Sequence, residues 1–237
     1  DEIEKEPKEI KWDAQAAEKA GFEHFMMKEI HEQPKAIKDT LGSVVNDGKI
    51  DLSNVGLAKE DIENISQIHI VACGSAWHVG MVAQYVIEDL ARIPVRVELA
   101  SEFRYRNPII DKDALVIIIS QSGETADSLA ALREAKSRGI KTLGIVNVVG
   151  SSIAREADNV FYTLAGPEIS VATTKAYSTQ LIASYILAIE FAMVRGQINQ
   201  EQYDGFLSEL SELPDKIQKI IDDKERLQWF ASKQANA

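Results

Sequence analysis

The chain has 237 residues, with 26 Lys and Arg against 37 Asp and Glu, which gives a formal net charge of −11 at pH 7. This acidic balance argues against a nucleic-acid-binding surface, because phosphate backbones attract Lys and Arg. The single cysteine, Cys73, excludes an intramolecular disulfide and a multi-cysteine metal cluster, and this usage is typical of a reducing cytoplasm.

The first 47 residues predict a charged linker followed by a helical arm. A helix is expected to begin with Asp13 as its cap and to break at Pro34, because the residue before a proline disfavours the helical conformation. A second helix is expected from Pro34 to about Val45. The Asn-Asp-Gly segment at residues 46–48 predicts a turn.

The middle of the chain, residues 48–200, alternates apolar runs with helical patterns. Five of the runs are expected to form strands, at residues 68–72, 95–99, 115–119, 142–146 and 160–163. Helices are expected between and after them, at residues 79–90, 126–138 and 174–195. This alternation predicts an α/β domain, a three-layer αβα sandwich in which helices cover both faces of a five-stranded parallel sheet.

The end of the chain, residues 201–237, predicts a helix or a helix pair with a bend at Pro214. The longest apolar stretch, from Leu181 to Val194, is interrupted by polar residues and too short to span a bilayer, so a buried helix is the better interpretation. The charged N terminus lacks the apolar core of a signal peptide. Because neither end resembles a natural domain edge, we expect the chain to be a piece of a longer polypeptide.

A hydroxyl-rich loop, residues 120–125, follows the predicted strand at 115–119 and leads into a helix. Its sequence is Ser-Gln-Ser-Gly-Glu-Thr. Ligands of a parallel sheet bind beyond the carboxyl ends of the strands, and free N–H groups at a helix start favour an anion. The hydroxyl and amide side chains add donors, and Gly123 lets the backbone approach an anion closely. The loop therefore predicts a phosphate site without Lys or Arg, and ordinary helix capping by Ser and Thr is the alternative that the residues leave open.

Other chemistries have weaker support. The sequence has neither a G-x-x-x-x-G-K-[ST] motif nor a G-x-G-x-x-G motif after a strand, so no nucleotide site is predicted. Ser122 is not in a nucleophile elbow, because Ser120 stands where that motif needs glycine. Cys73 is interpreted as a small packed residue rather than a thiolate nucleophile. The four histidines show no metal-ligand spacing, so we predict neither a metal nor a cofactor.

Three smaller interpretations concern single residues. Thr173 or Thr174 is expected to cap the long apolar helix. Lys175 could approach a bound anion, but it is interpreted as a solvated side chain, because a lysine in the first turn opposes the helix dipole. His69 lies inside a predicted strand and is interpreted as a packed residue.

Six segments together resemble one known family. They are AAEKAGFEHFMMKEIHEQP (16–34), VACGSAW (71–77), ELASEFRYR (98–106), SQSGETADSL (120–129), NVVGSS (147–152) and EISVATTKAY (168–177). In this order they are similar to the isomerase part of the glucosamine-6-phosphate synthase family, the glutamine:fructose-6-phosphate amidotransferases. The resemblance is to the first sugar isomerase (SIS) domain and extends over nearly the whole chain. The second, fourth and sixth segments resemble SIS domains broadly, whereas the first and third are more specific to the synthases.

This resemblance implies a site for fructose 6-phosphate or glucosamine 6-phosphate in the domain at residues 48–200. The residues that match the family's phosphate loop are Ser120, Gln121, Ser122 and Thr125. The residues that match its sugar-site loops are Cys73, Gly74, Ser75, Val171 and Thr173. The family often has a second hydroxyl after the position of Ser75, where this chain has Ala76, so that contact is expected to be lost or made by backbone or water.

The resemblance also implies partners outside this chain, a glutaminase domain before residue 1 and a second SIS domain after Ala237. In the family, that second half carries the lysine that forms a Schiff base with the open sugar, so no catalytic residue is expected here. The family's isomerase parts form symmetric dimers, so a cytoplasmic homodimer without nucleic-acid or membrane partners is expected. Two alternatives stay open: another SIS enzyme, such as a deglycase of phosphorylated sugar–amine adducts, and a non-catalytic sugar-phosphate sensor.

Overall fold

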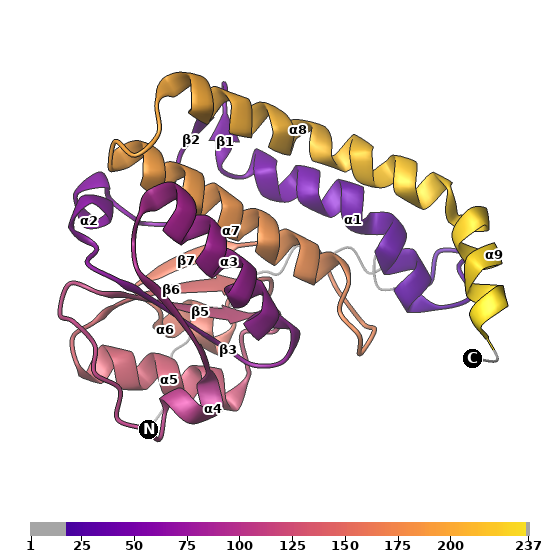
Figure 1. Ribbon diagram of the computed structural model, residues 1–237. Helices are drawn as coiled ribbons and strands as arrows, with labels where there is room; N and C mark the ends of the chain where they lie inside the picture. The colour runs from indigo at the N-terminus through magenta and orange to yellow at the C-terminus, as the bar shows by residue number, and fades with distance from the viewer. Residues whose placement is uncertain (1–17, 236–237) are drawn as a thin grey trace, which may run out of the picture.

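The structure is a computed structural model that describes residues 18–235 (Figure 1). At its centre lies a five-stranded sheet in the order β4-β3-β5-β6-β7, in which all neighbouring strands are parallel. The strands are β3 (Ile68–Ala72), β4 (Val95–Leu99), β5 (Leu115–Ser120), β6 (Lys141–Val146) and β7 (Asn159–Tyr162). The predicted α/β sandwich is confirmed, and each predicted strand matches an observed one within one residue at either end.

Helices cover both faces of the sheet. The helices of the described residues are α1 (Phe25–Gly42), α2 (Lys59–Asn64), α3 (Ser75–Ala91), α4 (Ala100–Phe103), α5 (Ala126–Ser137), α6 (Ser152–Glu156), α7 (Lys175–Val194), α8 (Gln200–Asp222) and α9 (Lys224–Gln234). On one face, α3 and α7 share a large apolar cluster with Ile70, and on the other face α4, α5 and α6 share a second cluster with Val71. These neighbours point into different clusters because side chains alternate in direction along a strand.

A short antiparallel hairpin lies between α1 and α2. Its strands are β1 (Val45–Asn46) and β2 (Lys49–Ile50). The two connecting residues, Asp47 and Gly48, have φ values of 49° and 72°, as the tight turns of two-residue hairpins require. The predicted turn at residues 46–48 is therefore confirmed. The flanking strands were not predicted, because two residues are too few to show an alternating pattern.

The predicted helix break at Pro34 is wrong, because α1 continues without interruption from Phe25 to Gly42. Proline has no backbone N–H to bond the carbonyl of Ile30, four residues earlier. The side chain of the preceding residue, Gln33, replaces that donor: its Nε2 lies 3.1 Å from the Ile30 oxygen. The expected cap, Asp13, lies outside the described residues.

Two long helices form a further layer outside α7. Figure 1 shows α1 and α8 side by side along that helix, and all three are in contact. The predicted C-terminal helix pair is confirmed, but α8 runs through Pro214 and the two helices separate at Asp223. The division of the chain at residues 47 and 200 stays a prediction.

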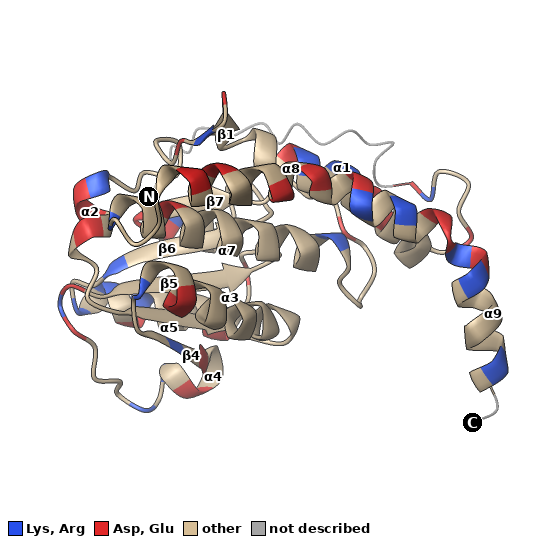
Figure 2. Cartoon of the chain, turned by 45° about the horizontal axis from the view of Figure 1, so that its top comes forward, with Lys and Arg blue, Asp and Glu red and all other residues tan. Residues whose placement is uncertain are grey.

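Within the described residues, α7 is the one helix that is long and apolar enough to cross a membrane by length and composition alone. Thirteen of its 20 residues are buried, and it packs against α1 and α3. In Figure 2 it is tan over nearly its whole length, whereas the outer helices α1 and α8 carry blue and red segments along their length. This is the composition of a core helix, as predicted.

Candidate functional site

A cavity of about 250 Å³ lies at the carboxyl ends of β3 and β5, beside the loop that precedes α7. The residues that line it are Cys73, Ser75, Ala76, Ile119, Ser120, Gln121, Ser122, Thr125, Glu168, Ser170, Val171, Thr173 and Gln180. They include eight of the nine predicted site residues, and the ninth, Gly74, lies between two of them in the sequence. The structure therefore brings the three predicted loops together, while their binding of a ligand remains a prediction.

The loop at residues 120–125 is shaped by its own hydroxyl groups. The Ser120 Oγ accepts a hydrogen bond from the Gly123 backbone N–H at 3.0 Å and lies 3.1 Å from the Thr125 Oγ1. Thr125 occupies the N-cap position of α5, but its side chain makes no capping hydrogen bond. Helix capping, the alternative explanation for this hydroxyl, is therefore wrong. The first backbone N–H groups of α5 stay available as anion donors.

Gly123 is required by a close contact within the protein. Its φ is +66°, and a Cβ on it would lie 2.0 Å from the Ser151 Oγ. The Gly123 carbonyl accepts the N–H of Ile153 at 3.0 Å, and the Glu124 carboxylate accepts the N–H of Ser152 at 2.7 Å. The loop thus lies directly against the first turn of α6. The prediction gave this glycine a role in approaching an anion and missed the packing that fixes it.

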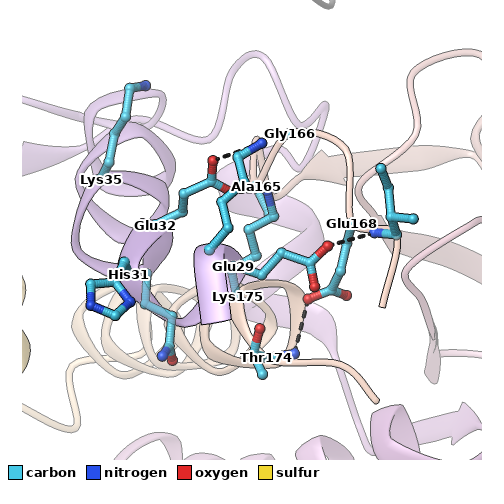
Figure 3. Close-up of polar contacts among 12 residues, drawn as sticks. Glu29, His31, Glu32, Lys35, Ala165, Gly166, Glu168, Thr174 and Lys175 are labelled. Atoms are coloured by element: carbon cyan, nitrogen blue, oxygen red, sulfur yellow. Dashed lines mark hydrogen bonds and ion pairs between the residues drawn. The ribbon is translucent and has the colours of Figure 1, made fainter. Parts of the chain in front are cut away.

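Glu168 caps α7 from outside the helix. Its Oε1 accepts hydrogen bonds from the backbone N–H groups of Thr174 at 2.9 Å and Ala176 at 3.2 Å (Figure 3). The Thr173 hydroxyl donates to the other carboxylate oxygen at 2.7 Å. The expected cap by a threonine side chain is therefore wrong. A carboxylate is also the better group here, because the N-terminal end of a helix favours negative charge.

Lys175 is buried, with 2% of its surface exposed, so the prediction of a solvated side chain is wrong. Its Nζ lies 2.6 Å from the Glu32 Oε2, a carboxylate supplied by α1 (Figure 3). This partner compensates for both the burial of the ammonium group and its position at the positive end of α7. Local sequence could not indicate the pair, since the two residues are 143 positions apart.

Two further groups interpreted from the sequence are Cys73, in the lining of the cavity, and His69, inside β3. Cys73 has a free, half-buried thiol whose Sγ lies 4.0 Å from the Ser128 Oγ. His69 is fully buried, and its Nδ1 lies 3.2 Å from the Glu98 carboxylate. Burial lowers the pKa of His69 in spite of that carboxylate. The ring is packed inside the sheet, as predicted. Within residues 18–235, no group of three or more His, Cys, Asp or Glu is placed to hold a metal.

Five of the residues that line the cavity were not predicted. Glu168 and Ser170 lie in the segment EISVATTKAY, from which only two positions were assigned to the site. Gln180 is a buried amide in the mostly apolar helix α7, and buried polar groups need partners. Ala76 and Ile119 are neighbours of predicted residues.

The described lining offers hydroxyl, amide and backbone donors and a single carboxylate, with no Lys, Arg or His. The oxygens of that carboxylate, Glu168, already accept three hydrogen bonds from the loop and α7. This set can bind and orient an oxyanion.

Comparison with known proteins gives a consistent picture. The SIS domain family model matches residues 61–190. The chain is 59% identical over 229 residues to a glutamine–fructose-6-phosphate aminotransferase [isomerizing] from Caldanaerobacter subterraneus subsp. tengcongensis. It is 58% identical over 233 residues to the protein of the same name from Clostridium tetani. These alignments cover 96% and 98% of this chain but only 38% of each relative, so the chain spans well under half of their length.

A solved structure is similar as well. The C-terminal domain of glucosamine-fructose-6-phosphate aminotransferase from Francisella tularensis superposes with a TM-score of 0.80 at 42% sequence identity. The match covers 84% of this chain and 55% of that one. The likeness thus extends from sequence to fold.

Proposed function

Because the chain belongs to the SIS domain family, we propose that it is the phosphosugar-binding half of the isomerase part of a glucosamine-6-phosphate synthase. The whole enzyme would make glucosamine 6-phosphate from fructose 6-phosphate and glutamine. The observation that carries the proposal is the cavity where the hydroxyl-rich loop, the start of α5 and the predicted sugar loops meet. The names of the similar proteins support this function over a deglycase or a sensor.

In this proposal the phosphate binds at the start of α5. Its donors are the side chains of Ser120, Gln121, Ser122 and Thr125. Backbone N–H groups of the first turn contribute as well, because the N-terminal end of a helix carries partial positive charge. Ala76 adds no hydroxyl, but its backbone N–H lies in the first turn of α3 and stays a donor whatever the side chain.

The sugar then extends from the phosphate toward the other two loops. Its neighbours there are Cys73, Gly74, Ser75, Val171 and Thr173. We place no catalytic residue in this chain, and assign the Schiff-base lysine and the acid–base groups to a second SIS domain of the full-length protein. A glutaminase domain would supply ammonia, and the assembly would be a cytoplasmic homodimer.

The direct test replaces one phosphate donor. Thr125→Val removes a hydroxyl that faces the cavity while keeping the size of the side chain. A hydrogen bond to a charged acceptor contributes about 1.5–3 kcal/mol, so the affinity for fructose 6-phosphate should fall by roughly ten- to a hundredfold. Isothermal titration calorimetry of the 237-residue chain measures this change.

Two controls make the result specific to the phosphate. Thr125→Ser keeps the hydroxyl and should bind fructose 6-phosphate nearly as tightly as the original chain. Fructose without its phosphate should bind much more weakly than fructose 6-phosphate. Equal affinity of the chain for the two sugars would rule out the proposed function.

A further inference from the structure

Helix α1 reaches the wall of the cavity through side chains on one of its faces. Glu29, Glu32 and Gln33 have the i, i+3, i+4 spacing that brings side chains together on a helix. The Glu29 Oε1 accepts hydrogen bonds from the backbone N–H groups of Ile169 at 2.7 Å and Ser170 at 3.2 Å. Figure 3 shows this carboxylate pointing from α1 into the loop that precedes α7.

The other two side chains fix the far end of the same loop. Glu32 forms the ion pair with Lys175, the first residue of α7. The Ser178 hydroxyl donates to the Gln33 Oε1 at 2.6 Å. The loop at residues 168–174 is therefore attached to α1 near its beginning, by Glu29, and immediately after its end, by Glu32.

This loop has few other means of keeping its shape. It contains no helix or strand, and its two large apolar side chains bury little surface within this chain: Val171 is fully exposed and Ile169 is 46% exposed. Segments with little buried apolar surface open at low free energy. Glu168 orders the last part of the loop through α7, but the backbone at Ile169 and Ser170 is held by Glu29.

Glu29 is also a carboxylate in a buried position, where apolar side chains are usual. It is only 2% exposed, and its Oε2 has no hydrogen-bond partner within the described residues. Burying a carboxylate is costly unless hydrogen bonds compensate for the lost water. The compensation here comes from the two loop N–H groups, so this side chain and the loop backbone depend on each other.

We propose that Glu29 is a positioning residue for the phosphosugar site. It holds the backbone at Ile169 and Ser170 in place before a ligand arrives, so that binding does not have to order the cavity wall. The affinity of the site then depends on a helix that lines no part of the cavity. The nature of the ligand rests on the proposed function, whereas the restraint on the loop does not.

The test compares three variants of the 237-residue chain. Glu29→Ala removes the acceptor, and Glu29→Gln keeps an amide oxygen in the same place. Ile37→Ala removes buried apolar contacts of the same helix and is the control for lost stability. Hydrogen exchange of residues 166–174 without ligand measures the restraint, and calorimetry with glucosamine 6-phosphate measures the affinity.

In Glu29→Ala, the loop amides should exchange at least tenfold faster and the Kd should rise about tenfold. Glu29→Gln should recover most of both values, since its amide oxygen accepts the same two hydrogen bonds. Ile37→Ala should lower the melting temperature while it leaves loop exchange and Kd within about twofold of the original chain.

The outcomes separate this inference from the proposed function. If the original chain binds the phosphosugar and Glu29→Ala binds it equally well, the positioning role is wrong and the proposed function stands. Unchanged loop exchange in Glu29→Ala, or equal effects of Ile37→Ala on exchange and Kd, also overturns the role. If no variant binds a phosphosugar while Glu29→Ala speeds loop exchange, the proposed function is wrong and the restraint by Glu29 stands.

Discussion

The two loops that face each other across the cavity are held in different ways. The loop at 120–125 takes its shape from hydrogen bonds within six residues, such as those of the Ser120 hydroxyl. The loop at 168–174 is held from α1, by Glu29 and Glu32, at sequence separations of 140 residues or more. One wall of the site is therefore held by contacts within the loop and with the start of α6, 28 positions away, whereas the other depends on a helix 140 positions away.

The largest loss of stability is expected when the long-range attachment of the loop at 168–174 to α1 is removed. Glu32→Ala leaves the buried Lys175 ammonium without this carboxylate, and removal of one partner from a buried ion pair is strongly destabilising. Because Glu32 is itself part-exposed, we expect a loss near the low end of the usual range, about 3 kcal/mol in the free energy of unfolding. Urea denaturation measures it.

A double variant shows whether the charge is the cause. Glu32→Ala combined with Lys175→Met replaces the buried ammonium by an apolar side chain of similar length, so part of the lost stability should return. The rest should stay lost, because the Glu32 Oε1 also lies 3.3 Å from the Nζ of Lys28, which is itself only 5% exposed. A double variant no more stable than Glu32→Ala alone would show that the carboxylate acts in some other way than by neutralising Lys175.

A second prediction concerns the loop at 120–125 and its contact with the start of α6. Gly123→Ala introduces a Cβ into the Ser151 side chain and forces an alanine into the left-handed region, so it should cost about 2 kcal/mol or more. Gly150→Ala is the matched control: its φ is +73°, but no atom lies within 4 Å of the added Cβ. The control should cost about 1 kcal/mol, for the backbone strain alone. Equal losses in urea denaturation would contradict the packing role of Gly123.

The smallest effect is expected in the pH dependence of stability, through the Glu124 carboxylate in the loop at 120–125. Hydrogen bonds from Ser152 lower the pKa of Glu124 below its ordinary value of 4.5. A lowered pKa in the folded state contributes stability that is present above the unfolded value and lost as pH falls through the folded value. Since Glu124 is exposed, its contribution should be no more than about 0.5 kcal/mol.

Urea denaturation of the original chain and of Glu124→Gln at pH 7 and pH 3 measures this contribution. The original chain should be slightly more stable at pH 7, and the difference should shrink on acidification. A difference that grows as the pH falls has the wrong sign for this interaction.

The same contrast explains how much could be predicted from sequence. The five strands were found because continuous apolar runs such as 115–119 are what buried parallel strands require. The hydroxyl-rich loop was found because its donors are adjacent in the chain. Lys175 and Pro34 were misread, because each is accommodated by a side chain whose contact a local pattern does not show: a distant carboxylate in one case and the Gln33 amide in the other.

The residues of the site divide in the same way, into those that local motifs indicate and those that only long-range contacts show. The predicted binding residues came from local motifs and a family resemblance, and the structure gathers eight of the nine around one cavity. Glu29 was not predicted at all, since nothing near it in the sequence indicates that its carboxylate is buried against a loop 140 residues later. Pairs of this kind are fixed by how α1 docks on α7, which the spacing of residues within α1 does not determine.

The absence of Lys and Arg from the described lining of the cavity has a consequence for the conditions under which the site works. The chain carries a net charge of −11, so its long-range field repels an anionic ligand instead of drawing it in. Dissolved salt screens such repulsion over a Debye length of about 8 Å at physiological ionic strength. If the chain binds a phosphosugar as proposed, capture would depend on short-range hydrogen bonds and become easier, not harder, as ionic strength rises, the reverse of a site that attracts phosphate with lysine or arginine.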